Sequence, residues 1–278
     1  MCATKQCQRE LFSAKMNDPN LLEDLAQLAP CSECRYYLPN ELNTLSLNND
    51  TFSLLHLNVR SLPKNFDNLS NLLNSINHTF SFIGITESWL KSNSPPLFNI
   101  QGYSMLKSDR PNGRGGGVVL YIKKGIQYKV LNDIPASPHF QTIFIEIKNP
   151  KGKHIVVGVT YRPPSSSIDS FTNYIESCLD VVSRNGKHLY IMGDFNINLT
   201  QSQDNTSGRK FLTFLSSYAL FPLINIQTRV NAKSSTLIDN IITNVAECKF
   251  ESGVLYTDIS DHMPIFCARN KENIPHKK

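Results

Sequence analysis

The sequence has no apolar run long enough to cross a membrane. No stretch approaches the roughly 18–20 consecutive apolar residues that a transmembrane helix needs. The first 15 residues, MCATKQCQRELFSAK, also lack the apolar core of a secretory signal peptide. We therefore expect an intracellular protein with no membrane partner, whose Asn-X-Ser/Thr motifs, such as the one at 77–79, carry no glycans.

A disulfide framework is not expected either. The seven cysteines are an odd number and are scattered along the chain, so reduced thiols are the simplest interpretation for an intracellular protein. Cys31 and Cys34 have the spacing of half a zinc site, and Cys2 with Cys7 could complete four ligands. The spacing of this second pair is unusual, and we favour the interpretation without zinc.

Neither the net charge nor the amino-acid composition indicates a particular function. Hydrophobic residues make up 40% of the 278 residues and charged residues 18%. These values suit a globular protein with enough length for one large domain or two small ones. The net charge of +5 permits a nucleic-acid partner, whose phosphates attract Lys and Arg, without requiring one.

Hydrophobic periodicity divides the chain into two parts. In residues 1–50 only DPNLLEDLAQLAP, at 18–30, predicts a helix, and we expect this segment to lie outside the main domain. Residues 51–270 form one expected domain, and 271–278 form a tail. Strands are predicted at 51–57, 80–85, 116–122, 142–147, 154–161, 188–193, 237–244 and 263–268, and helices at 63–78, 168–186 and 208–220. This order predicts an α/β fold with sheet in the core and helices outside.

The stretch LYIMGDFNINL, at 189–199, ends a buried strand on a carboxylate and an amide. Residues two apart in a strand point to the same side, so Asp194 and Asn196 should project together, into a turn or into a polar site. Other predicted strands also end on, contain or follow polar residues. These are Asn58, Glu87, Tyr161, Arg162, Asp239, Asp261 and His262. Each alone has an ordinary explanation, such as a turn residue or a surface contact.

Together these residues supply what metal-assisted hydrolysis of a phosphate ester requires. Four carboxylates without a thiolate or a His cluster suit a hard cation such as Mg²⁺. A histidine backed by an aspartate can touch a phosphate or move a proton. No Ser or Cys nucleophile has a convincing partner, so we expect direct attack by water.

Six motifs, in this order and spacing, resemble the endonuclease/exonuclease/phosphatase superfamily, the fold of DNase I and apurinic endonucleases. They are ITESWL, RGGGVVLYI, YRPP, GDFN, LIDNI and SDHMPI, within about residues 51–268. More narrowly, RGGGVVLYIKKGI, GVTYRPP and SDHMPI resemble the endonuclease domain of LINE-type non-LTR retrotransposons. The resemblance implies a four-layer α/β sandwich, with two packed mixed sheets flanked by helices. It also implies a Mg²⁺-dependent endonuclease, with Mn²⁺ able to substitute, that nicks DNA for insertion.

The resemblance also implies roles for the matched residues. Glu87 and Asp261 match metal ligands. Asp194 matches the residue that orients or deprotonates the attacking water, and Asn196 matches the amide that helps to hold water and phosphate.

The remaining matches concern the phosphate. His262 matches a phosphate-binding imidazole, and Asp239 matches its carboxylate partner. Tyr161 matches a tyrosine at the scissile phosphate, and Asn58 matches the first-strand Asn of the site. Arg162, next to this tyrosine, could bind a DNA phosphate or cap a strand end, and we favour the phosphate.

Arg60 departs from the pattern, because many relatives carry an acidic residue two positions after the first-strand Asn. Retrotransposon-type members often tolerate other residues there, so we do not interpret Arg60 as inactivating. The glycine-rich NGRGGGVVLYIKK lacks the Gly-Lys-Ser/Thr ending of a phosphate-binding loop and the spacing of a dinucleotide fingerprint. We expect a glycine turn that leads into a strand.

Two alternatives to a DNA endonuclease stay open. One is a superfamily enzyme with another phosphoester substrate, and the other is an inactive retrotransposon relic that only binds nucleic acid. The chain stops at Lys278, where a full element would continue into a reverse transcriptase, so we expect that segment to be separate or lost. A DNA substrate implies a nuclear location.

Overall fold

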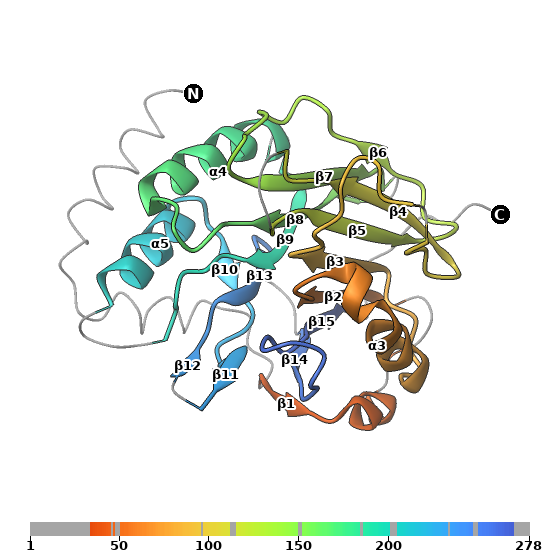
Figure 1. Ribbon diagram of the computed structural model, residues 1–278. Coiled ribbons are helices and arrows are strands. Elements are labelled where there is room, and N and C mark those ends of the chain that lie inside the picture. Colours follow the sequence, from red (N-terminus) through yellow and green to blue (C-terminus); the bar gives the residue numbers. More distant parts are fainter. Residues whose placement is uncertain are drawn as a thin grey trace.

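Two β-sheets pack face to face, with helices on their outer faces (Figure 1). The computed structural model describes residues 34–45, 47, 51–95, 97–111, 115–149, 152–183, 186–200, 205–232, 234–246 and 250–269. The expected four-layer α/β sandwich is confirmed. Within the described ranges, no helix is both long enough and apolar enough to span a bilayer.

The first sheet has seven strands in the order β1-β14-β15-β2-β3-β5-β4. Its strands are β1 (Arg35–Tyr37), β2 (Phe52–Asn58), β3 (Phe82–Thr86), β4 (Tyr103–Ser108), β5 (Val118–Lys123), β14 (Glu251–Leu255) and β15 (Ile265–Arg269). The α3 helix (Leu62–Ser75) connects β2 to β3, which run parallel with Asn58 opposite Thr86. The carboxyl ends of these two strands therefore lie at the same edge of the sheet.

The second sheet has six strands in the order β10-β13-β9-β8-β7-β6. Its strands are β6 (Lys129–Val130), β7 (Gln141–Ile147), β8 (Ile155–Tyr161), β9 (His188–Asp194), β10 (Phe221–Pro222) and β13 (Asp239–Thr243). The α4 helix (Ile168–Val182) connects the parallel strands β8 and β9, and α5 (Thr206–Ser217) follows β9. A separate hairpin pairs β11 (Arg229–Asn231) with β12 (Ser234–Thr236).

The central strands are buried on both faces, which explains their continuous apolar runs. On β5, Val118, Leu120 and Ile122 belong to the core shared with the second sheet. The intervening Val119 and Tyr121 belong to the core that includes residues of α3. The α4 and α5 helices cover the opposite side of the molecule (Figure 1). Because both faces of these strands are buried, their polar residues lie at the strand ends.

Residues 35–44 differ from the expectation that the first 50 residues lie outside the main domain. The β1 strand pairs in parallel with β14 at the edge of the first sheet. Tyr37 and Leu42 are buried in the core beneath that sheet, and a 3-10 helix, η1 (Pro39–Thr44), follows β1. The helix expected at 18–30 lies outside the described residues, as do Cys2, Cys7 and Cys31 of the possible zinc site.

Candidate active site

Strand ends from both sheets converge at one edge of the sandwich. In the second sheet, Asp194 at the end of β9 lies opposite Tyr161 of β8 on one side and Asp239 of β13 on the other. In the first sheet, Asn58 ends β2, and its Nδ2 donates to Asp194 Oδ2 across 2.8 Å. This bond joins the two sheets, and it places the buried carboxylate of Asp194 at the centre of the site.

The Gly-Asp-Phe-Asn turn holds Asp194 and Asn196 together as the sequence predicts. A Cβ on Gly193 would lie 2.1 Å from the carbonyl oxygen of Thr160, so only glycine allows β8 and β9 to approach this closely. Phe195 turns into the core, while the Asn196 backbone N donates to Asp194 Oδ1 at 2.9 Å. The Asn196 Nδ2 donates to Asp194 Oδ2 at 3.1 Å. The amide thus orients the carboxylate.

Asp239 and His262 form a buried pair beside Asp194. His262 Nδ1 lies 2.8 Å from Asp239 Oδ2, which also accepts a hydrogen bond of 2.8 Å from the Thr228 hydroxyl. His56 of β2 lies behind the pair, with its Nδ1 3.9 Å from Asp239 Oδ1. With Nδ1 engaged by Asp239, His262 keeps Nε2 available for a substrate.

Burial and mutual charge set the protonation of this cluster. Burial and, to a smaller extent, the negative charge of the neighbouring Asp239 together raise the pKa of Asp194 to about 7. Burial alone would lower the pKa of His262, but the charge and hydrogen bond of Asp239 raise it to about 9. Burial lowers the pKa of His56 to about 4. At neutral pH the cluster therefore holds a cationic His262 and a neutral His56, and Asp194 titrates near neutrality.

Glu87 lies on the loop after β3, at the adjoining strand end. Its carboxylate accepts hydrogen bonds from the Tyr161 hydroxyl and the Trp89 indole, and from the Gly116 backbone N at 3.3 Å. Residues 115–117 are glycines with positive φ, and they lead directly into β5. The expected glycine turn is confirmed for these residues, and its backbone approaches Glu87.

Backbone strain is concentrated around this edge. Among the described residues, six non-glycine residues have positive φ, and five of them flank the site. They are Arg60, Ser61, Glu87, Trp89 and Asn196. Such conformations cost on the order of 1–3 kcal/mol each and cluster at functional sites. Here backbone bonds offset the cost, including Ser61 N to Glu87 O at 2.9 Å.

Asp261 lies between two arginines at the rim of the site. Its Oδ1 is 2.9 Å from Arg60 Nη1, and its Oδ2 is 2.7 Å from Arg229 Nη2. The arginine that replaces a commonly acidic residue therefore pairs with an acid expected to bind metal. Both oxygens of Asp261 are engaged in these ion pairs.

One group of the described residues can hold a metal ion. Asp194, Asp239 and His262 each offer a ligand atom, and these atoms all lie within 4.8 Å of one another. Asp239 Oδ1 is buried without a hydrogen-bond partner, and two carboxylates crowd the site, so a divalent cation fits this donor set when the His262 imidazole is neutral. Glu87 and Asp261 lie outside this group, and their role as metal ligands stays a prediction.

Arg162 does not have the surroundings expected of a phosphate-binding residue. It is buried, and its Nη1 donates to the carbonyl oxygens of Phe195 at 3.3 Å and of Asn196 at 3.0 Å. Its Nη2 donates to the carbonyl oxygen of Ser166. The guanidinium thus satisfies the backbone of the Gly-Asp-Phe-Asn turn.

We expect Arg162→Met to lower the free energy of unfolding by about 2–4 kcal/mol, because it leaves buried carbonyl groups without their donor. Urea unfolding of the whole protein measures this, with the exposed Arg209→Met as control. A variant with unchanged stability and weakened DNA binding would instead show that Arg162 binds phosphate.

Sequence reasoning missed three residues of the site. His56 lies two positions before Asn58 on β2, so strand alternation could have placed both on one face. Thr228 and Ser260 carry no such signal. The Ser260 hydroxyl donates to the Asn58 carbonyl at 2.6 Å and accepts from the His262 backbone N at 3.1 Å.

Comparison with known proteins identifies the fold. Residues 155–266 match the family model described as endonuclease-reverse transcriptase. The endonuclease domain of TRAS1, a telomere-specific non-LTR retrotransposon, superposes with a TM-score of 0.57 and 14% identity, over 82% of this chain and 100% of that chain. The chain therefore has the DNase I-like fold, and residues 155–266 resemble the endonuclease-reverse transcriptase family.

Other superfamily structures are equally similar in fold. The catalytic domain of Xenopus laevis APE2 gives a TM-score of 0.60 and 16% identity, over 80% of this chain and 95% of that one. A 3′ phosphatase from Neisseria, bound to a product DNA hairpin, gives 0.58 and 17%, over 78% and 98%. No curated protein matches the sequence significantly. The TM-scores establish the shared DNase I-like fold, and the low identities leave the substrate to be inferred from the site.

Proposed function

We propose that this chain is a divalent-metal-dependent endonuclease that hydrolyses a phosphodiester bond in DNA, the strand-nicking step of retrotransposon insertion. The observation that carries the proposal is the buried Asp194, Asp239 and His262 cluster at the edge where both sheets end. The retrotransposon endonuclease fold and the matching family model support a DNA substrate. A DNA substrate would place the protein in the nucleus, with a reverse transcriptase segment as its functional partner.

Asp194 is the proposed proton acceptor. A carboxylate that titrates near pH 7 can take a proton from water at neutral pH. Asn58 and Asn196 fix its orientation through the bonds described above. As the water oxygen bonds to phosphorus, its proton passes to Asp194. The bond from phosphorus to the leaving ester oxygen breaks, and this oxygen takes a proton from solvent to leave as an alcohol.

His262 and Tyr161 are the proposed phosphate contacts. The cationic imidazole, held by Asp239, stabilises the charge that develops on the phosphate oxygens. The Tyr161 hydroxyl, which now donates to Glu87, lies at the same edge. Glu87 and Asp261 would hold a divalent ion, because a cationic His262 cannot ligate one, and the ion would supply Lewis-acid stabilisation of that charge.

A substrate panel tests the proposed substrate class. Purified protein with Mg²⁺ should nick supercoiled DNA and leave single-stranded RNA and inositol phosphates intact. Hydrolysis of RNA or of an inositol phosphate, with the plasmid unchanged, would assign the other phosphoester. DNA binding with no hydrolysis of any substrate would assign the inactive relic.

A further inference from the structure

The end of the sandwich opposite the candidate active site is strongly basic. Strands β5 and β7 end there, β8 and β9 begin there, and β6 pairs with β7 near its end. These segments contain six lysines and one acid, Glu146, and their formal charge of +5 equals the net charge of the whole chain. We call this surface the basic end, and its segments are residues 122–130, 145–149, 152–155 and 186–189.

The basic end is far from the catalytic cluster. The β9 strand runs from His188 at the basic end to Asp194 in the site, and β8 runs alongside it from Ile155 to Tyr161. At about 3.3 Å per residue, the two ends of β9 are about 20 Å apart. An anion bound at the basic end would therefore not be the phosphate that reacts at Asp194.

Strand register and ion pairs bring several of these side chains together. Lys129 lies opposite Glu146 in the β6–β7 pair, and Lys148 directly follows β7. Glu146 Oε1 lies 3.0 Å from Lys187 Nζ and 2.7 Å from His154 Nδ1. The one acid of the basic end is therefore engaged by Lys187 and His154, and it leaves the charge of the other lysines uncompensated.

Four lysines of the basic end are exposed. They are Lys124, Lys129, Lys148 and Lys153. None of the four forms an ion pair with a residue that the structure describes. Clustered like charges create a positive potential that attracts a polyanion and is relieved when one binds.

The basic end favours nucleic acid over a lipid or protein partner. Five large hydrophobic side chains are exposed among the described residues, and none of them belongs to its segments. A membrane-binding surface inserts apolar side chains between lipids, and protein interfaces are depleted of lysine. Lysine contacts to a sugar-phosphate backbone need no apolar side chain and supply most of its sequence-independent binding.

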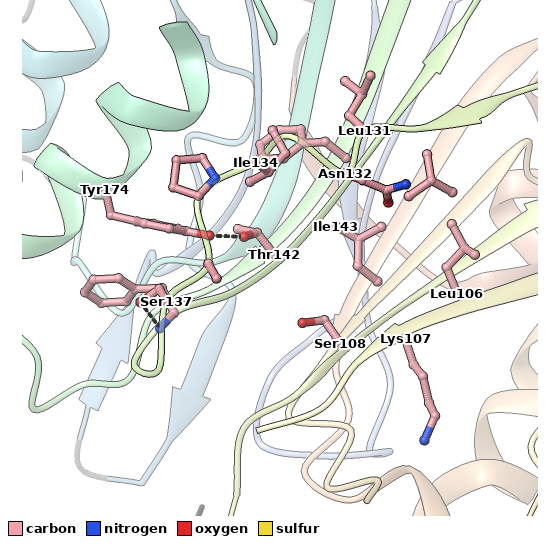
Figure 2. A pocket seen from close by; sticks show the side chains of 15 residues that line it. Leu106, Lys107, Ser108, Leu131, Asn132, Ile134, Ser137, Thr142, Ile143 and Tyr174 are labelled. Atoms are coloured by element: carbon pink, nitrogen blue, oxygen red, sulfur yellow. Dashed lines mark hydrogen bonds between the residues drawn. The ribbon is translucent and has the colours of Figure 1, made fainter. Parts of the chain in front are cut away.

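A cavity that adjoins β6 has a different character. It has a volume of about 330 Å³, lies between β4, β7 and α4, and includes Val130 in its lining (Figure 2). Its one lysine, Lys107, is engaged by Asp109 at 2.7 Å. The hydroxyl groups of Thr142 and Tyr174 bond to each other there. The free positive charge therefore lies on the exposed basic end and outside this cavity.

We propose that the basic end binds the sugar-phosphate backbone of a nucleic-acid segment other than the one that is cut. The inference rests on the proposed function only in distinguishing this segment from the cleaved one. Phosphate contacts fix position without reading base sequence, so single strands of DNA and of RNA share the required chemistry. The protein thus holds one segment at the basic end while the opposite end reaches the DNA that it nicks.

Chemical footprinting of lysines in EDTA tests the proposal on the full-length wild-type protein. Acetylation by an N-hydroxysuccinimide ester is quantified at each lysine by mass spectrometry, with and without a single strand of about 20 nucleotides, of DNA or of RNA. We expect either strand to suppress acetylation of Lys129, Lys148 and Lys153. Lys210, exposed on α5, is the control and should react equally with and without the strand.

The salt dependence of strand affinity provides a second readout. For a single strand, each phosphate contact contributes about 0.7 to the slope of log affinity against log salt. The Lys148→Gln/Lys153→Gln variant should therefore have a slope that is shallower by about 1.4. The Arg209→Gln/Lys210→Gln variant removes the same charge from exposed side chains of α5 and should keep the wild-type slope.

Each outcome decides for or against the basic end as a nucleic-acid site. Protection by one kind of strand alone supports the proposal and identifies the strand. Unprotected lysines with both strands, or an equal change of slope in the two variants, would overturn it. Protection by phosphatidylserine vesicles and by neither strand would assign the basic end to a lipid surface and also overturn it. Nicking without this protection sinks only this inference, and protection without nicking sinks only the proposed function.

Discussion

The Asp194→Asn variant should lose nicking activity and gain stability above neutral pH. We expect nicking to fall by about 10²–10⁴-fold, the usual contribution of a general base. The substitution keeps the size of the side chain and removes its charge. Both effects therefore follow from the same buried carboxylate.

The gain in stability follows from the raised pKa. Asp194 titrates at about 7 in the folded protein, against a reference value of 3.8. Between pH 3.8 and pH 7, Asp194 is protonated in the folded state and ionised in the unfolded state. The contribution of Asp194 to the free energy of unfolding therefore falls as pH rises. The shift corresponds to about 4 kcal/mol, and because Asn loses part of the bonding to Asn58 and Asn196, we expect a net gain of about 1–2 kcal/mol.

Urea unfolding in EDTA at pH 4.5 and at pH 8 measures this gain. The difference between Asp194→Asn and wild type should grow with pH, and the exposed Asp67→Asn on α3 should show no such growth. If Asp194→Asn lowered the free energy of unfolding by the same amount at pH 8 and at pH 4.5, the pKa of Asp194 would not be raised in the folded protein.

The His262→Gln variant should lose about 10²–10⁴-fold in nicking and flatten the pH dependence of stability. The pKa of His262 is raised to about 9 by its pairing with Asp239. Its contribution to the free energy of unfolding is therefore complete below about pH 6.5 and is lost as pH rises through 9. In the metal-free wild type this contribution falls by at most about 1.4 kcal/mol per pH unit within that window.

Glutamine at this position also leaves Asp239 without its charged partner. Removing one member of a buried ion pair costs about 3–5 kcal/mol, so the variant should be less stable at pH 6 and approach wild type near pH 9.5. Thermal unfolding in EDTA from pH 6 to pH 9.5 measures the stability difference between variant and wild type at each pH. The exposed His139→Gln is the control. Parallel curves for wild type and His262→Gln would show that the imidazole is not charged in the fold.

Much of the site could be predicted because its residues sit at strand ends within local motifs. The Gly-Asp-Phe-Asn turn shows this best. Strand alternation predicts that Asp194 and Asn196 lie together, and they do, although β9 ends at Asp194 and a turn with positive φ at Asn196 brings them together. The Asp261-His262 motif is likewise local, because it directly precedes the predicted strand that the structure shows as β15. These features depend on a few consecutive residues.

The features of the fold and site that the sequence does not predict depend on contacts between segments far apart in the chain. Arg60 and Asp261 are 201 residues apart, and no local pattern announces their ion pair. The β1 strand has only three residues, and its partner β14 contains a glycine, so neither shows a strand pattern of useful length. Arg162 is next to Tyr161 in the chain, which favours a place in the site, whereas its guanidinium contacts backbone carbonyl groups that no local pattern announces.

The measurement that tests the account most directly is nicking of supercoiled plasmid by the purified full-length protein, with Mg²⁺ and with EDTA. Asp194→Asn and His262→Gln are run beside it, with Asp67→Asn as control. We predict open circles from wild type and Asp67→Asn with Mg²⁺, and supercoiled DNA in every other lane. Intact plasmid with folded wild-type protein and Mg²⁺, or nicking that persists in both site variants, would contradict the account.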